Sequence, residues 1–409
     1  MKVTMVVPTY WARASGEGWK AGDAVYDHPT PLDQDGTLLR MLQSVEVLQD
    51  KDFRIVVIAA PTAPDIAARV EAKVGALIHA ASGAGVETLL FGPSHLKRIH
   101  EVLSEAGRED SCELLQLRGY SNLRNLCLFL PHVLASDAAV LIDDDEVFED
   151  PQYLSKAREF IGRTVDGKWV GAVAGYYLQP DGEYRLKKGT RPWMRIWDQV
   201  KNMNQAFERT IGSEPRLKAT PFVFGGNMVV HRDLFTVVPF DPNVRRGEDI
   251  DFLINARMFG FEFFLDNQLA IKHLPPPKTH PRWKQFREDI FRFVYEKAKI
   301  EGQSGVSGMT RVTPEEFNPY PGCFLKPDLQ EKVAKSCELL AQEFFDQGDR
   351  KAAEETLKNI AIAKTEAEPE ANPFETLCQL QNRWEALMKQ VGRQSLRSKL
   401  AKILTGDAR

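Results

Sequence analysis

Four consecutive acidic residues, Asp143 to Glu146, directly follow an apolar segment at residues 138–142. A short apolar run of this kind predicts a buried strand, and open α/β sheets bind their ligands at the carboxyl ends of such strands. Adjacent carboxylates repel one another, so the cluster is costly unless a positive group lies there. In an extended chain Asp143 and Asp145 point to one side and Asp144 to the other. A divalent cation near Asp143 and Asp145 is the simplest interpretation, and a solvated acidic turn is the alternative.

The composition is that of an ordinary globular protein, with 43% hydrophobic and 27% charged residues in a chain of 409, long enough for two domains or three. The net charge of −4 gives no positive field that would attract nucleic acid. Five scattered cysteines without CxxC spacing predict neither a disulfide framework nor a zinc site. The first residues do not form a signal peptide, and no run approaches the ~20 apolar residues that span a bilayer. We therefore expect a soluble, cytoplasmic protein.

Strand-like and helix-like segments alternate along the first part of the chain. The expected strands are at 3–7, 53–60, 86–91 and 138–142, and the expected helices are at 37–48, 65–81, 94–106 and 122–134. This alternation predicts an α/β fold with a mainly parallel sheet and helices on both faces. A polar, glycine-rich loop from 11 to 36 contains Tyr26-Asp27-His28-Pro29 and follows the first strand closely enough to reach over a site at its end.

The pattern changes after the acidic run. Strands are expected at 169–178, 222–230, 261–265 and 269–273 and a helix at 247–259, whereas from 282 onward only helices are expected, at 283–300, 329–345, 351–364, 374–391 and 395–404. We predict an α/β domain over residues 1–275 and an all-helical C-terminal extension over residues 276–409. The plain interpretation of the extension is a cap or a homo-oligomer contact. Its basic end (Arg393, Arg397, Lys399, Lys402) also suits peripheral contact with an anionic inner-membrane surface.

Five short segments, taken in chain order, form a known pattern. They are Pro8-Thr9-Tyr10, Arg124-Asn125, Asp143-x-Asp145, Gly247-Glu248-Asp249-Ile250-Asp251 and the late His273. In this order and spacing the segments resemble those of the GT-A fold glycosyltransferases, most closely the family-2-like group. The resemblance covers about residues 1 to 275 and depends on the joint order, because each motif alone is weak.

The resemblance implies a metal-dependent hexosyltransferase that uses a nucleotide-diphosphate sugar. A divalent ion, Mn²⁺ or Mg²⁺, would stabilise the departing diphosphate. Asp145 is the implied direct ligand, and Asp143 would reach the ribose or the metal through water. His273 would complete the coordination, since a neutral imidazole suits Mn²⁺ better than Mg²⁺. A histidine that ends a strand is otherwise often only a packed core or surface residue.

The implied donor-binding residues are Pro8, Thr9, Tyr10, Arg124, Asp143 and Asp144. Arg124 has two explanations. It pairs with the diphosphate or the acidic run, where its planar fork suits bidentate contacts, or it is a surface cation of a helix. No acid stands directly after the second strand, and Asp65 lies further on. The nucleotide base is therefore open, with UDP ahead of GDP only by family frequency.

Glu248 and Asp249 at a helix start also have two explanations. Acids near a helix N-terminus are favoured by the helix dipole. In the resembling family one of the two removes the proton of the acceptor hydroxyl, and we assign Asp249 as this base with Glu248 as the alternative. Asp251 would orient its neighbours. A candidate base favours inversion, and retention stays open.

Two further groups are candidates for acceptor binding. Gly225 and Gly226 would let a sugar approach the backbone closely, or they form a tight bend between strands. Trp193 and Trp197, with Arg191 and Arg195, would line an acceptor pocket, or the tryptophans pack a helix. The acceptor itself, a sugar, a polyol, a lipid-linked glycan or a protein, is not fixed by the sequence.

Three other classes fit less well. A haloacid-dehalogenase-like phosphatase would use Asp143 as nucleophile and Asp145 as acid and base, but that family places this motif on its first strand. A nucleotidyltransferase needs a glycine-rich basic loop after strand one, which residues 8–13 do not supply. A non-catalytic carbohydrate-binding protein would tolerate loss of Asp145 or Asp249, yet both are present.

Overall fold

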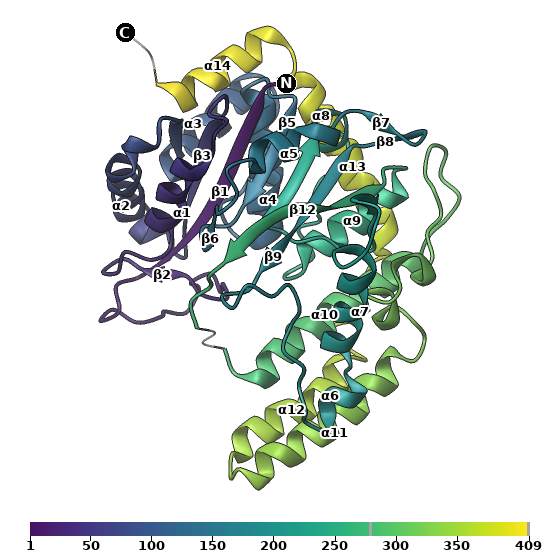
Figure 1. Ribbon diagram of the computed structural model, residues 1–409. Coiled ribbons are helices and arrows are strands. Elements are labelled where there is room, and N and C mark those ends of the chain that lie inside the picture. The colour runs from purple at the N-terminus through teal and green to yellow at the C-terminus, as the bar shows by residue number, and fades with distance from the viewer. Residues whose placement is uncertain (278–279, 407–409) are drawn as a thin grey trace.

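The structure is a computed structural model that describes residues 1–277 and 280–406. Within these residues ten strands form one sheet (Figure 1). From edge to edge its main path is β10 (Leu217–Ala219), β12 (Phe263–His273), β9 (Ala172–Leu178), β11 (Asn227–His231), β5 (Ala138–Ile142), β1 (Val3–Ala12), β3 (Arg54–Pro61) and β4 (Glu87–Phe91), with β2 (Thr30–Pro31) beside β1 and β6 (Glu146–Val147) beside β12. Strands β5, β1, β3 and β4 are parallel, as are β9 and β12, whereas β11 runs antiparallel between β5 and β9. The predicted mainly parallel sheet is confirmed.

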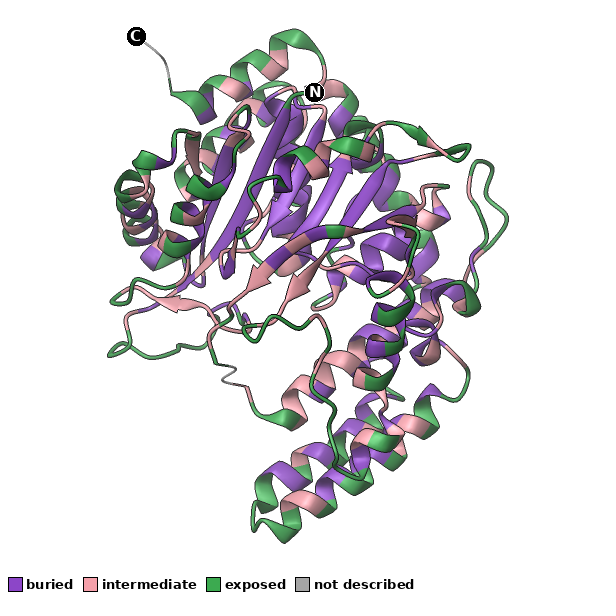
Figure 2. Cartoon of the chain, viewed as in Figure 1, coloured by how far each residue is buried: buried purple, intermediate pink, exposed green. Residues whose placement is uncertain are grey.

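Helices cover both faces of this sheet. They are α1 (Leu38–Ser44), α2 (Ala67–Ala80) and α5 (Tyr153–Phe160) on one face, and α3 (Pro93–Glu105), α4 (Tyr120–Val133), α8 (Arg232–Phe235) and α9 (Glu248–Met258) on the other. In β1, Met5 and Val7 belong to the core of the first face and Val6 to that of the second, because successive side chains of a strand point to opposite faces. Figure 2 shows the central strands as the most deeply buried part of the chain.

Two strands differ from the sequence expectation. Strand β1 continues through Pro8 to Ala12, although the proline predicts an end at residue 7. Past Val6 the strand has lost its β5 neighbour and pairs with β3 on the other side, so a residue without an amide N–H is tolerated. The segments expected at 261–265 and 269–273 form the single strand β12, with a register shift between Leu265 and Ala270. Residues 222–226, expected to be extended, are not part of β11.

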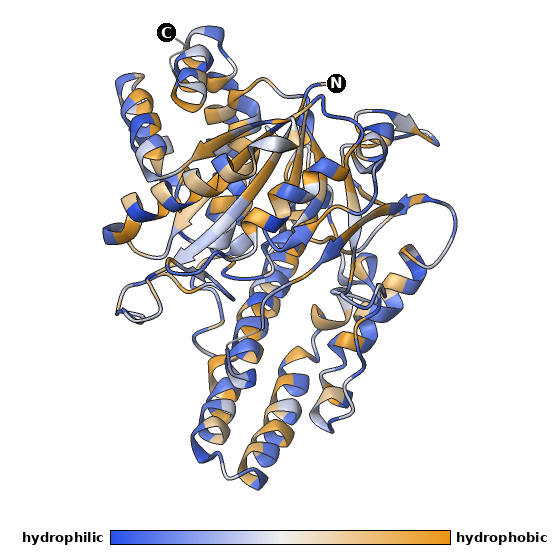
Figure 3. Ribbon diagram, turned by 60° about the vertical axis from the view of Figure 1, so that its left-hand side comes forward, coloured by the Kyte–Doolittle hydropathy of each residue, from blue (hydrophilic) through white to orange (hydrophobic). Residues whose placement is uncertain are grey.

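The C-terminal part is helical, as predicted. Its helices are α10 (Arg282–Glu301), α11 (Leu329–Asp346), α12 (Arg350–Ile362), α13 (Pro373–Val391) and α14 (Gln394–Thr405). Helices α10, α11 and α12 extend away from the sheet together with the short α6 (Trp193–Ile196) and with α7 (Gln199–Thr210) (Figure 1). Polar and apolar residues alternate along them, as expected of helices with one packed face (Figure 3).

Helices α13 and α14 return to the sheet layer and share its core. The Trp384 indole N–H donates to the Phe235 carbonyl at 2.9 Å, and His132 of α4 bonds the Met388 carbonyl at 2.7 Å. Helix α14 buries Leu400 and Ile403 in the same core. The boundary at residue 275, the membrane contact and the oligomer contact stay predictions. Among the described residues, no helix combines the length and the apolar character that a membrane crossing requires.

Candidate functional site

A cavity of about 600 Å³ opens where the carboxyl ends of β1 and β5 meet the start of α9 and one side of α10. It brings together most of the residues that the sequence nominates. Those that line it are Tyr10, Arg124, Asp143, Asp144, Asp145, Trp193, Trp197, Gly225, Glu248, Asp249 and His273. Pro8, Thr9 and Gly226 are buried and are not among its lining residues within the described chain. These three residues therefore do not line the cavity, and Thr9 contributes through its hydrogen bond to Asp144.

The three aspartates of the acidic run diverge. Asp143 Oδ1 lies 2.9 Å from Arg124 Nη2, and Asp144 Oδ2 accepts a hydrogen bond from the Thr9 hydroxyl at 2.5 Å. Asp145 Oδ2 lies 3.2 Å from Nε2 of His28 and 3.4 Å from Nε2 of His273. Each carboxylate thus meets a different set of partners.

The surroundings of Asp144 and Asp145 shift the pKa values of these two aspartates in opposite directions. Burial raises the pKa of Asp144 to about 7, and the neighbouring Asp145 adds to the rise. Burial alone would also raise the pKa of Asp145, but its hydrogen bonds with His273 and His28 outweigh burial and hold that pKa well below its ordinary value. Asp145 is therefore the acid of the run that stays ionised most firmly.

The atoms around Asp145 suit a divalent cation. Donor atoms about 2.1 Å from one metal ion lie roughly 3 Å apart at tetrahedral or octahedral angles, which is close to the spacing of Asp145 Oδ2 from the two imidazole nitrogens. Carboxylate and imidazole together are a donor set that Mn²⁺ accepts. No ready-made cage of three or more His, Cys, Asp or Glu side chains occurs in residues 1–277 and 280–406. Both histidines contact Asp145 directly, so a cation would bind by replacing these contacts.

His28 has no role among the sequence predictions, although its loop was expected to reach the site. Near the start of the loop the buried guanidinium of Arg13 binds Asp23, in the middle of the loop, at 2.9 Å and Asp65, after β3, at 2.6 Å. The Tyr26 ring packs 4.4 Å from the ring of Tyr10, measured between centroids. These contacts fold the loop over the end of β1 and bring His28 to Asp145. Asp65 is thereby engaged by Arg13.

Arg124 connects the acidic run to helix α9. Its side chain is 4% exposed, so the interpretation as a surface cation is wrong. Nη2 lies 2.9 Å from Asp143, and Nε donates to Glu248 Oε1 at 3.2 Å. Gly225 must be small here, because a Cβ atom at this position would lie 2.7 Å from Arg124 Nη2. At Gly226 a Cβ atom would lie 2.2 Å from Glu146 Oε1. The two glycines thus permit close packing against the charged side chains.

Asp249 lies in the cavity wall in a fixed orientation. Its Oδ2 accepts the Gly225 amide N–H at 3.1 Å, and its Oδ1 accepts the Ile250 amide N–H at 2.8 Å. Burial, followed by the charge of Glu248, raises the pKa of Asp249. A carboxylate with a raised pKa binds a proton more readily, which is the property of a general base. Glu248 is engaged by Arg124 and is the weaker candidate.

The two tryptophans form an aromatic wall of the same cavity. The Trp197 ring centroid lies 4.6 Å from that of Phe286 and 4.7 Å from that of Phe324. The tryptophans pack against helix α10, as the second interpretation predicts, and they also line the cavity, while acceptor binding stays a prediction. Arg191 and Arg195 are not among the cavity residues that the structure describes, and Arg191 pairs with Glu343 instead.

Helix α10 contributes cavity residues that the sequence did not nominate, among them Arg282, Asp289 and Arg292. They lie outside the part of the chain that the family resemblance covers. Only the position of α10 against α9 and α6 brings them to the site, and no local motif marks them.

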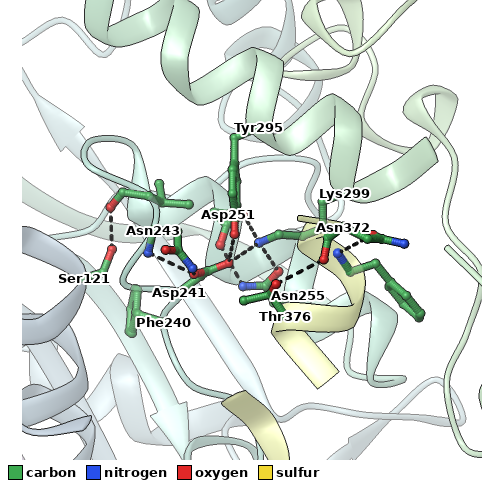
Figure 4. Close-up of polar contacts among 12 residues, drawn as sticks. Ser121, Phe240, Asp241, Asn243, Asp251, Asn255, Tyr295, Lys299, Asn372 and Thr376 are labelled. Carbon is green, nitrogen blue, oxygen red and sulfur yellow. Dashed lines mark hydrogen bonds and ion pairs between the residues drawn. The ribbon is translucent and has the colours of Figure 1, made fainter. Parts of the chain in front are cut away.

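A buried charged network holds α10 against α9 (Figure 4). The Lys299 ammonium lies 2.5 Å from Asp251 Oδ1, 3.0 Å from Asp241 Oδ2 and 3.0 Å from Asn255 Oδ1. The Tyr295 hydroxyl donates to Asp241 at 2.8 Å. The side chains of Lys299, Asp241 and Asp251 are 0% exposed. Asp251 thus orients its neighbours, as the sequence suggested, and fixes the helix that begins with Glu248 and Asp249.

No protein family model and no curated protein sequence matches the chain. Solved structures with partial likeness include the mannosyltransferase PcManGT from Pyrobaculum calidifontis in complex with GDP-Man and Mn²⁺, at 14% identity and a TM-score of 0.48 over 96% of this chain and 87% of that one. Glucosyl-3-phosphoglycerate synthase from Mycobacterium tuberculosis in complex with Mn²⁺ and UDP-glucose matches at 13% identity and a TM-score of 0.36, over 76% and 86% of the two chains. GalNAc-T7 with UDP, GalNAc and Mn²⁺ matches at 12% identity and a TM-score of 0.39, over 82% of this chain and 57% of that one. Likenesses this distant do not assign an activity.

Proposed function

We propose that the protein is a metal-dependent glycosyltransferase that moves a hexose from a nucleotide-diphosphate sugar to an acceptor hydroxyl, with inversion at the anomeric carbon. The observation that carries the proposal is geometric: one cavity is lined by Asp145, which lies within 3.4 Å of two imidazole nitrogens, and by Asp249, whose carboxylate is held by two amide N–H groups. Asp145, between two histidines, has a lowered pKa, whereas Asp249, in the wall of the same cavity, has a raised one. In many enzymes, titratable groups whose pKa values are shifted in opposite directions have different roles in catalysis.

The donor side consists of the acidic run and its partners. Asp145, His28 and His273 would hold the divalent ion, with Asp143 near it. When bound, the ion supplies positive charge to the departing diphosphate. Arg124, held by Asp143 and Glu248, adds a fixed cation to the same wall. Tyr10 and Asp144 would contact the nucleoside. The preference for UDP over GDP comes from the family resemblance alone.

On the acceptor side Asp249 would act as the base. The acceptor oxygen forms a bond to the anomeric carbon while the bond from that carbon to the diphosphate oxygen breaks. The proton of the acceptor hydroxyl passes to Asp249, and the electron pair of the broken bond leaves with the diphosphate. The two amide N–H groups on Asp249 hold its carboxylate in place for this transfer.

A thermal-shift screen of UDP- and GDP-sugars, each with and without Mn²⁺, tests the proposal. We expect one nucleotide sugar to raise the melting temperature only when Mn²⁺ is present, and the Asp145→Ala variant to lose this shift. The proposal fails if no nucleotide sugar shifts the protein and Asp145→Ala leaves metal binding intact. Release of phosphate from simple phosphate esters, without any nucleotide sugar, would instead favour the phosphatase alternative. The configuration of the product, determined by NMR, separates inversion from retention.

A further inference from the structure

Two buried hydrogen-bond donors on the wall that α6 and α10 give to the cavity have no partner among the described residues. They are Nη2 of Arg292 and Nε1 of Trp193, and both residues line the cavity. Arg292 is 8% exposed and Trp193 is 5% exposed, so neither donor is well served by bulk water. Buried polar groups in proteins are almost always paired. Two unpaired donors in one cavity therefore indicate a ligand that supplies acceptor atoms.

Arg292 is held rigidly while its Nη2 is left unpaired. Its Nε donates to Glu296 Oε1 at 2.9 Å, one helical turn further along α10. The guanidinium lies 4.8 Å from the ring centroid of Phe293. It passes directly over Gly247, where a Cβ atom would lie 2.4 Å from Arg292 Cδ. Gly247 directly precedes α9, so the guanidinium is fixed beside the start of the helix that carries Asp249.

The chemistry of the unpaired donors selects an anion. An indole N–H and a guanidinium can only donate, so they need an atom with lone pairs. A neutral hydroxyl also has lone pairs, but it brings a proton that needs an acceptor of its own. A carboxylate or a phosphate brings several lone pairs, and the planar guanidinium matches either group. Arg282, which lies over the Trp193 ring at 5.9 Å, places a second cation at the same wall.

We propose that the acceptor carries an oxyanion, a carboxylate or a phosphate, which Arg292 and Trp193 bind while the acceptor hydroxyl faces Asp249. This inference rests on the proposed function and adds the chemical class of the acceptor. It also gives α10 a role in the active site. The helical extension supplies the acceptor-recognising cation, and the α/β part supplies the donor site and the base.

Isothermal titration with a matched set of probes tests the inference. Glucose, glucuronate, glucose 6-phosphate and inorganic phosphate are titrated into the full chain in the presence of UDP and Mg²⁺. The three hexoses share a ring and differ in the group at one carbon, so their order of affinity separates carboxylate from phosphate. We expect at least one anionic probe to bind at least tenfold more tightly than glucose.

Substitutions of Arg292 and Trp193 test whether these two residues bind the anionic probe. Arg292→Gln should weaken the anionic probe at least tenfold, Arg292→Lys less, and Trp193→Phe about threefold, because the last change removes the N–H with the five-membered ring of the indole and keeps one aromatic ring. Lys297→Gln is the matched control, since Lys297 lies on α10 in a partly exposed position and pairs with Glu301. The control should bind as the parent chain does.

Two results would overturn the inference. One is that every anionic probe binds the parent chain no more tightly than glucose. The other is that the anionic probe keeps its affinity in Arg292→Lys and Trp193→Phe, variants that preserve the charge or an aromatic ring and so test the idea even if Arg292→Gln does not fold. A Mn²⁺-dependent shift with a nucleotide sugar in the same preparations shows that only this inference has failed. Absence of that shift points to failure of the proposed function itself.

Discussion

Two groups of buried or half-buried carboxylates in the described part of the chain are built differently. The first, the cavity acids, comprises Asp143, Asp144, Asp145 and Asp249. The second, the network acids, comprises Asp241 and Asp251 around Lys299. Each group has one member in the first turn of α9, yet only the first group lines a cavity.

The network acids have a cation between them, with Asn255 and Tyr295 completing the contacts. Burial acts to lower the pKa of Lys299, but Asp251 and Asp241 outweigh burial and raise it, so the ammonium stays charged. Of the cavity acids, Asp143 contacts Arg124 and Asp145 contacts two histidines, whereas Asp144 accepts a hydrogen bond from the Thr9 hydroxyl. Burial raises the pKa of Asp144 to about 7. In the network both carboxylates contact the Lys299 ammonium directly, whereas at the cavity Asp144 contacts the neutral Thr9 hydroxyl. This difference predicts that substitutions in the two groups have opposite effects.

The largest expected effect is the loss of transfer in Asp249→Asn. The amide oxygen can still accept the Gly225 N–H, but the side chain can no longer take a proton. We expect the transfer rate to fall about 10²–10⁴-fold, the usual contribution of a general base. The amide nitrogen cannot accept the Ile250 N–H, but the substitution also removes a charge from the site, so urea denaturation should show a change of no more than about 1 kcal/mol. Asp181→Asn, in an exposed loop, is the control. A rate within tenfold of the parent would exclude Asp249 as the base.

Removal of the network cation should instead cost stability. Lys299→Met leaves Asp241 and Asp251 buried without their cation, and breaking a buried pair in this way costs about 3–5 kcal/mol. Urea denaturation at pH 7 measures the loss. Lys297→Met, at a partly exposed position of the same helix, should change stability by no more than about 0.5 kcal/mol. Equal losses in the two variants would contradict the assigned role of the network.

A smaller effect of opposite sign is expected from Asp144→Asn. Because the pKa of Asp144 is about 7 in the folded protein, against an ordinary value of 3.8, its ionisation destabilises the protein increasingly as the pH rises from about 4 to 7. The asparagine cannot ionise and can still accept from Thr9. The metal-free variant should be more stable than the parent by about 1–3 kcal/mol at pH 8, and by much less at pH 4. A loss of stability at pH 8 would show that ionised Asp144 does not destabilise the folded protein.

The smallest effect concerns Glu296, which contacts Arg292 and belongs to α10. Burial raises the pKa of Glu296 to about 7, from 4.5. Stability should therefore decline between about pH 5 and pH 7 as this group ionises. In Glu296→Gln that decline should be shallower by about 1 kcal/mol, since the remaining charges titrate as before. Denaturation midpoints at pH 5, 6, 7 and 8 measure the difference. Parallel curves would mean that Glu296 is ionised throughout.

The sequence predicts the sheet and the place of the acidic run at its edge, because their signals are local. An apolar run followed by acids predicts β5 and its ligand edge. A Gly-Glu-Asp start predicts α9. The order of such segments places their ends at one edge of the sheet, since the carboxyl ends of parallel strands lie together.

Two parts of the site have no such signal. His28 reaches Asp145 through a loop that is folded back by tertiary contacts, among them Arg13 with Asp23 and Asp65, and Tyr26 with Tyr10. Arg292 reaches the cavity only because α10 packs beside α9, which depends on Lys299 and its buried partners. Contacts between distant segments are set by tertiary packing, and neither periodicity nor a motif in one sequence encodes them.

The most direct measurement is Mn²⁺ binding, quantified from the electron paramagnetic resonance signal of the free ion. For the parent chain we predict binding that becomes tighter when the matching nucleoside diphosphate is added. In Asp145→Asn this binding should be lost, whereas Asp241→Asn, from the network, should bind Mn²⁺ as the parent does wherever it remains folded. Undiminished, nucleotide-responsive Mn²⁺ binding by Asp145→Asn would contradict the account.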